Sequence, residues 1–180
     1  MHALSAGLLP EGCRLMIGEP KLEYRDKQRY VAIRTQVPIP FGKYLGPLWD
    51  EVTRWLKNQG LVSTGPAIIR YLTTDMSKKL DIDVGFLIDQ AVTGDDRITV
   101  DVLPAGQYAT LLYTGPYKGK GIYKATVAIL EWAKQNQIVW DTTVKEDVEW
   151  WAGRVEWYLS DPAIEADTHK YRTELAFLTA

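Results

Sequence analysis

The sequence is poor in the residues that usually hold metals and form disulfides. Among its 180 residues there is one cysteine, Cys13, and there are two histidines, His2 and His169. A single cysteine excludes an internal disulfide, and so few soft ligands argue against the common zinc sites. We therefore expect no metal and no other cofactor, and a reducing, cytoplasmic location is the default expectation.

Strong charge and long apolar runs are also missing. The formal net charge is −2, so no basic field would attract nucleic acid. No apolar run approaches the roughly 20 residues that span a bilayer, so no membrane partner is expected either. Residues 1–18 lack the regions of a secretory signal, and we expect them to form a poorly ordered extension before one domain over residues 19–180.

Tryptophan and tyrosine, in contrast, are abundant. The chain holds seven Trp and ten Tyr but only three Phe. Trp and Tyr combine a large apolar face with one polar group, which suits ligand cavities as well as cores. Both interpretations stay open at this point.

Hydrophobic periodicity predicts two helices and eight strands. Apolar residues at helical spacing indicate helices at roughly residues 45–59 and 121–137. Pro47 suits the first turn of the first helix, and Gly60 suits the position after its end. Alternation and β-branched or aromatic content predict strands at residues 22–26, 29–37, 67–72, 82–88, 98–103, 107–114, 154–159 and 172–178.

These elements repeat. Residues 20–92 and 97–180 each contain a short strand followed by strand–helix–strand–strand, and Tyr30 in the first half corresponds to Tyr108 in the second. One such half cannot cover both faces of its own sheet, so we expect the two halves to pair. The prediction is an α+β fold of duplicated units with pseudo-twofold symmetry and antiparallel sheets that form a central ligand groove.

The strand at 154–159 (Arg-Val-Glu-Trp-Tyr-Leu) carries an acid at its centre. Glu156 and Tyr158 share one face of this strand, and the first half has Ile69 where the second has Glu156. Burying an unpaired charge is costly, so Glu156 must face water or a pocket, or have a partner. The partner would be Arg154, Arg172 or Lys170 across the sheet.

A pocket acid has two uses. On an aromatic face, Glu156 would stabilise a lipophilic cation between stacked rings. Desolvation would also raise its pKa, which suits activation of a water molecule that attacks a strained ring carbon. Tyr113 or Tyr158 would then hold the departing oxygen.

The second half has extra residues at about 139–153. Trp140, Trp150 and Trp151 lie in this polar connection, where core packing should not require them. We expect them to form walls or a lid of an asymmetric pocket; the alternative is that they cap the core.

Several motifs together resemble a known family. They are Tyr-Thr-Gly-Pro-Tyr at 113–117, Leu-Glu-Trp at 130–132, Glu-Trp-Tyr-Leu at 156–159, Arg-Thr-Glu at 172–174, and Leu-Glu-Tyr-Arg-Asp at 22–26. In this order, they resemble the GyrI-like small-molecule-binding family over about residues 20–180. That family shares its fold with the effector domains of multidrug-responsive MerR and AraC transcription regulators.

The resemblance implies a groove that binds aromatic, often cationic, compounds. It makes Glu156 the central pocket acid and Glu174 a second acid on the neighbouring strand. Tyr117 is a further candidate for the groove, and so is Tyr71, the first-half counterpart of Tyr158. The chain contains no helix-turn-helix pattern, so it resembles a stand-alone member.

Three functions stay open. The first is binding of aromatic or cationic small molecules. The second is hydrolysis of cyclopropane-bearing, DNA-alkylating cytotoxins, because some stand-alone members of the family resemble hydrolases of that kind. The third, an inhibitory contact with DNA gyrase, follows only from the family's name. A carboxylate open to water and to a ligand carbon would favour hydrolysis, and one shielded by rings would favour binding.

Overall fold

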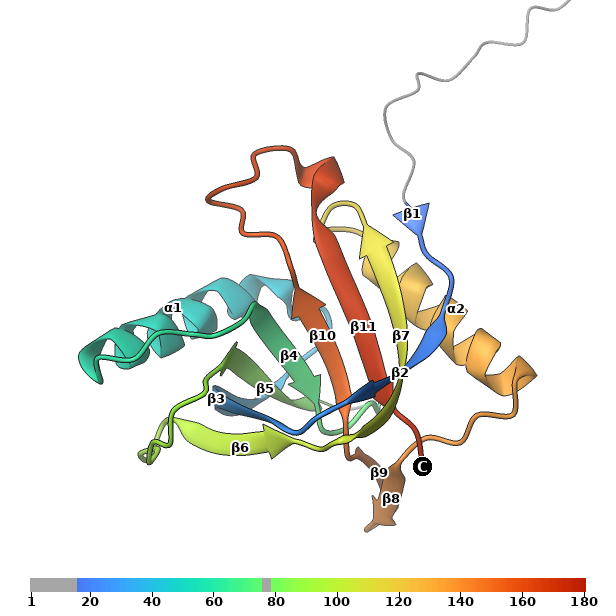
Figure 1. The fold of residues 1–180 in the computed structure, drawn as a ribbon, viewed down its shortest axis with the longest axis horizontal. Coiled ribbons are helices and arrows are strands. Elements are labelled where there is room, and N and C mark those ends of the chain that lie inside the picture. The colour runs from blue at the N-terminus through green and yellow to red at the C-terminus, as the bar shows by residue number, and fades with distance from the viewer. Residues whose placement is uncertain (1–15, 76–78) are drawn as a thin grey trace, which may run out of the picture.

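The structure is a computed structural model that describes residues 16–75 and 79–180. A nine-stranded antiparallel sheet in the order β1-β7-β11-β10-β4-β5-β3-β6, with β2 beside β7, forms the body of the protein (Figure 1). The elements are β1 (Met16–Ile17), β2 (Lys21–Arg25), β3 (Gln28–Val37), α1 (Gly42–Asn58), β4 (Ala67–Tyr71), β5 (Leu80–Leu87), β6 (Thr99–Leu103), β7 (Gly106–Thr114), α2 (Gly121–Gln135), β8 (Thr142–Lys145), β9 (Val148–Trp151), β10 (Arg154–Tyr158), η1 (Thr168–Lys170) and β11 (Arg172–Leu178).

The predicted α+β fold class is confirmed. One unit is β3–α1–β4–β5 and the other is β7–α2–β10–β11, and the central strands β4 and β10 join them side by side. In this central pair Ile69 lies directly opposite Glu156. The acid therefore lies on the seam between the two halves.

The two halves exchange their first strands. β2 precedes β3 in sequence but pairs with β7 of the second half, while β6 precedes β7 but pairs with β3 of the first half. Glu23 lies opposite Tyr108 just as Asp101 lies opposite Tyr30. Each half thus completes the sheet edge of the other, which makes the halves interdependent.

Both helices lie on one face of the sheet and build a separate core there. α1 packs on β3 and β5 and, through Leu45, also against Ile69 and Tyr71 of β4, whereas α2 packs on β7 and β11 (Figure 1). Buried residues of α1 contact Val31 and Ile33, and those of α2 contact Leu111 and Leu175. We call the side of β4 and β10 that faces the helices the floor between the helices. No helix of the described residues is long and apolar enough to cross a membrane.

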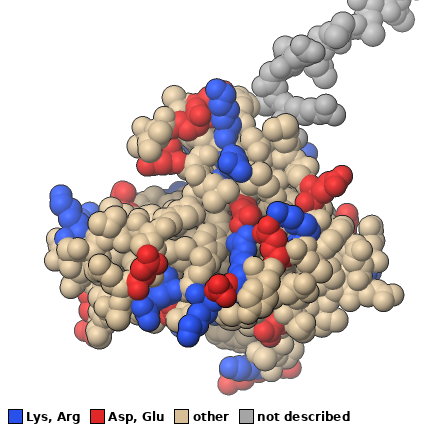
Figure 2. All heavy atoms as spheres, in the orientation of Figure 1, with Lys and Arg blue, Asp and Glu red and all other residues tan. Residues whose placement is uncertain are grey.

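The opposite face of the sheet carries a network of paired charges. The fully buried Asp83 accepts two hydrogen bonds from Arg34, both of 2.8 Å, and one of 2.5 Å from the Tyr30 hydroxyl. Arg25 forms a 2.7 Å ion pair with Glu174. Figure 2 shows charged side chains of both signs gathered in the centre of this face. Because these charges are paired, they need no ligand to offset their burial.

Three details differ from the sequence-based expectation. α1 begins at Gly42 rather than near residue 45, so Pro47 lies inside the helix instead of in its first turn. The stretch 139–153, expected as a connection, contains the β8–β9 hairpin. Of the expected N-terminal extension, residues 1–15 lie outside the described residues, and Met16–Ile17 pairs with β7 as β1.

Substitution of Gly85 by alanine should destabilise the fold. A Cβ atom there would lie 1.9 Å from the carbonyl oxygen of Val31 and 2.7 Å from Cα of Ala32, both backbone atoms of β3. We expect Gly85→Ala to lower the free energy of unfolding by about 3 kcal/mol in urea denaturation. Gly42→Ala, with nothing within 4 Å of the added atom, should change it by less than about 0.5 kcal/mol. Equal stability of the two variants would contradict the close approach of β3 and β5.

Candidate functional site

The candidate site lies on the helix face of β10. Side chains alternate along this strand, so Val155 and Trp157 point to the core on the opposite face, while Glu156 points toward the helices. Glu156 lies between Ile69 of β4 and Leu175 of β11, and only 6% of it is exposed. A carboxyl group is therefore buried at the centre of the sheet.

Two tyrosines hold this carboxyl group. The Tyr158 hydroxyl donates a hydrogen bond of 2.8 Å to Oε2 of Glu156, and the Tyr71 hydroxyl also hydrogen-bonds to it. The two tyrosines occupy corresponding positions in the two halves, so the duplication places one donor on each side of the single acid. Among residues 16–75 and 79–180, no basic group forms an ion pair with Glu156, although its pairing with a neighbouring cation was one sequence-based alternative.

Burial governs the electrostatics of the site. Burial raises the pKa of Glu156, and the hydrogen bonds from Tyr158 and Tyr71 and the charge of Arg154 offset this only in part. The pKa values of both tyrosines are raised well above their usual range, first by burial and then by the nearby Glu156. The tyrosines therefore stay protonated and act as hydrogen-bond donors. A nearby cation would favour the ionised form of Glu156.

An aromatic cluster closes one end of the site. Tyr158 makes edge-to-face contacts of 5.0 Å between ring centroids with Trp49 of α1 and with Tyr117, which precedes α2. Tyr117 in turn contacts Tyr171 at 4.6 Å, and its hydroxyl donates a 2.6 Å hydrogen bond to the Ser160 carbonyl. We call Trp49, Tyr117, Tyr158 and Tyr171 the aromatic wall. It joins both halves of the protein.

A cation lies at the other end. The Arg154 guanidinium carbon is 4.6 Å from the ring centroids of Trp151 and Phe177 and 5.8 Å from that of Tyr71. Burial lowers the pKa of Arg154, and Tyr71 and Glu156 oppose that effect. The floor between the helices thus carries Arg154, Glu156 and Tyr158 in a row.

The structure brings some of the predicted residues together. Tyr71 and Tyr158 contact Glu156, and Tyr117 contacts Tyr158. Trp151 is buried and stacks on Arg154, so it borders the site from the β8–β9 hairpin.

Other predicted residues lie elsewhere. Glu174 faces the opposite side of the sheet, because it pairs with Trp157 of β10 rather than with Glu156. Tyr113 is fully buried beneath α2, where its hydroxyl donates to the Pro116 carbonyl at 3.2 Å. Trp140 packs against Trp151 and Phe177 in the core of the second half. Trp150 forms an isolated β-bridge with Thr73.

Sequence reasoning missed three neighbours of the site. Trp49 lies on the apolar stripe of α1, Tyr171 ends the loop before β11, and Arg154 was considered only as an ion partner of Glu156. The parity of residues 154, 156 and 158 could have placed Arg154 on the floor. The position of Trp49 depends on how α1 packs, which the sequence does not show.

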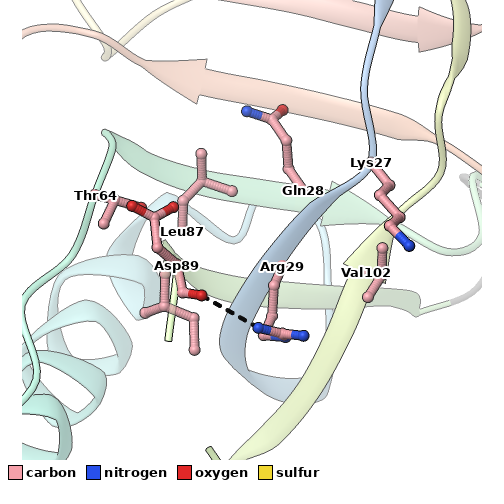
Figure 3. Close-up of a pocket in the computed structure, with 8 residues that line it drawn as sticks. Lys27, Gln28, Arg29, Thr64, Leu87, Asp89 and Val102 are labelled. Atoms are coloured by element: carbon pink, nitrogen blue, oxygen red, sulfur yellow. Dashed lines mark hydrogen bonds between the residues drawn. The ribbon is translucent and has the colours of Figure 1, made fainter. Parts of the chain in front are cut away.

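A hollow of the structure lies away from Glu156. It has a volume of about 410 Å³ and is lined by Lys27, Gln28, Arg29, Thr64, Leu87, Ile88, Asp89 and Val102 (Figure 3). Arg29 donates a hydrogen bond of 3.2 Å to the Asp89 carbonyl across it. Its lining contains no aromatic ring, so it is less suited than the floor between the helices to hold an aromatic ligand.

The raised pKa of Glu156 predicts a pH-dependent stability difference. Because the folded state holds the proton more tightly than the unfolded state, the stability from this group is complete below the ordinary glutamate pKa of 4.5. That stability is lost as pH rises through the folded-state pKa. We expect Glu156→Gln to gain stability relative to wild type as pH rises from about 4 to about 8, measured as the difference in melting temperature. A difference that does not vary with pH would contradict a raised pKa.

Comparisons with known proteins identify the fold and the family. EcmrR bound to DNA has a TM-score of 0.74 and 19% identity; the match covers 89% of this chain and 57% of that protein. The EcmrR C-terminal domain alone has a TM-score of 0.76 and 19% identity; the match covers 92% of this chain and 99% of that domain.

Two further solved structures share the fold. SAV2435 bound to tetraphenylphosphonium gives a TM-score of 0.59 at 16% identity, with 90% of this chain and 94% of that one covered. A hydrolase from Listeria innocua has a TM-score of 0.55 at 12% identity, and the match covers 90% of this chain and 92% of that one. A sequence comparison with curated proteins gave no match. The family model of the GyrI-like small molecule binding domain matches residues 18–178, and the chain belongs to this family.

Proposed function

We propose that this protein binds aromatic, lipophilic cations between α1 and α2, with Glu156 as the counter-charge. The observation that carries this proposal is the buried carboxyl group of Glu156, which two tyrosine hydroxyls hold and which no cation of the described residues pairs with. A buried carboxylate without an ion partner is costly in the free protein. A cationic ligand offsets that cost, so part of the binding free energy comes from relief of the unpaired charge.

The surrounding rings fit the same class of ligand. The ring centroids of Trp49 and Tyr117 each lie 5.0 Å from that of Tyr158. A cation over such rings gains about 0.5–2 kcal/mol per favourable contact, more when water is excluded. The solved structure of SAV2435 with tetraphenylphosphonium supports this ligand class, since that compound is a lipophilic aromatic cation.

The shielding of Glu156 favours binding over hydrolysis. The two groups that hold its carboxyl group are tyrosine hydroxyls, and the rings of Trp49 and Tyr117 pack against Tyr158. A general base would need a water molecule between the acid and the substrate, and the tyrosine hydroxyls already occupy the hydrogen-bonding positions of the carboxyl group. The likeness to a Listeria innocua hydrolase is a likeness of fold at 12% identity. We therefore expect no ring-opened product from a cyclopropane-bearing alkylator incubated with this protein.

Binding of tetraphenylphosphonium tests the proposal. Wild type should bind it with quenching of tryptophan fluorescence, because Trp49 lies in the aromatic wall. Glu156→Gln keeps the shape and the acceptor for Tyr158 but removes the charge, and it should raise the Kd at least about tenfold, measured by calorimetry.

The matched control is Glu174→Gln. Glu174 lies on the adjacent strand β11 but on the other face, paired with Arg25. This variant should bind tetraphenylphosphonium within about twofold of wild type. If both variants lose the same affinity for tetraphenylphosphonium, the effect comes from overall charge. If Glu156→Gln loses no affinity, the proposed site is refuted.

A further inference from the structure

Arg154 is a charged group without a hydrogen-bond acceptor among the described residues. Its guanidinium lies over the rings of Trp151, Phe177 and Tyr71, and its Nε atom is buried without a hydrogen-bond partner in the part of the chain that the structure describes. No hydrogen bond or ion pair of Arg154 is found among those residues. Stacking on rings offsets only part of the cost of removing a guanidinium from water. The site therefore offers donors that a ligand can satisfy.

Packing fixes the position of this guanidinium. Trp151 and Phe177 contact it at equal distances of 4.6 Å, and both rings are buried. Trp151 is itself tied down, since its Nε1 donates to the Thr74 hydroxyl at 3.2 Å and its backbone N–H donates to the Leu72 carbonyl at 2.9 Å. A guanidinium held on rigid rings is preorganised to bind a planar, bidentate partner such as a carboxylate.

Arg154 and Glu156 lie two residues apart on the same face of β10. Their Cα atoms are therefore about 7 Å apart along the strand. The floor thus carries one cation and one acid, with Tyr71 in contact with both. A ligand with only a positive charge gains from Glu156 but is repelled by Arg154.

We propose that the preferred ligands are aromatic zwitterions that place a cation at Glu156 and a carboxylate at Arg154. This inference rests on the proposed function and specifies its ligand class further. The two ligand charges are separated by about 7 Å, the spacing of the two residues on the strand. Tyr71, between the two charges, contacts the aromatic body of the ligand.

A pair of closely matched compounds tests the inference. The zwitterion 4-(trimethylammoniomethyl)benzoate carries both charges on one ring, and its methyl ester keeps the cation but loses the anion. Wild type should bind the zwitterion about tenfold more tightly than the ester in calorimetric titrations, since a charge-assisted pair is lost with the ester. Arg154→Met should abolish this preference and should bind tetraphenylphosphonium more tightly than wild type. Arg154→Lys, which keeps the charge but not the bidentate geometry, should retain only part of the preference.

The outcomes separate the two proposals. If wild type binds tetraphenylphosphonium but binds the ester as tightly as the zwitterion, the zwitterion inference is wrong and the proposed function stands. A preference that survives unchanged in Arg154→Met would also overturn the inference. If wild type binds no tetraphenylphosphonium, the proposed function fails, and the inference that rests on it fails too.

Discussion

The buried carboxyl group of Glu156, held between Tyr71 and Tyr158, is the interaction on which the proposed site depends. The duplicated fold supplies the two tyrosines at corresponding positions, but only the second half supplies an acid, because the first has Ile69 there. The seam of a nearly symmetric sheet therefore carries one asymmetric charge. That asymmetry distinguishes the proposed ligand site from a repeated core position.

Buried charged groups have different partners on the two faces of the sheet. On the face away from the helices, Asp83 is saturated by Arg34 and Tyr30, so that its burial is stabilised within the protein. On the helix face, Glu156 accepts hydrogen bonds from neutral tyrosine hydroxyls and feels the charge of Arg154, and the Arg154 guanidinium lies over aromatic rings without an ion pair among the described residues. The sheet is stabilised by the exchanged strands β2 and β6 and by the paired charges. This stability offsets the cost of burying Glu156 and Arg154 without an ion pair.

Much of the site follows from alternation and duplication. Parity places Glu156 and Tyr158 on one face, and the repeat identifies Tyr71 as the counterpart of Tyr158. The register of β10 against β11 is a tertiary property, and it places Glu174 beside Trp157 on the opposite face, which the motif Arg-Thr-Glu does not indicate. Trp140 faces the core because the β8–β9 hairpin folds Trp151 onto Phe177, and the polar sequence between them gives no sign of this. The place of Trp49 depends likewise on helix packing.

The central claim is that a cation binds beside Glu156, and the ionisation of this one carboxyl group tests it most directly. Carbon-13 NMR of protein labelled at the glutamate carboxyl carbon gives its pKa, with Glu156→Gln used to assign the signal. In the free protein the pKa should lie above the usual glutamate range, because burial raises it. Saturating tetraphenylphosphonium should lower it, since a nearby cation favours the charged form. A pKa that stays unchanged while tetraphenylphosphonium binds would show that the cation binds elsewhere and would contradict the central claim.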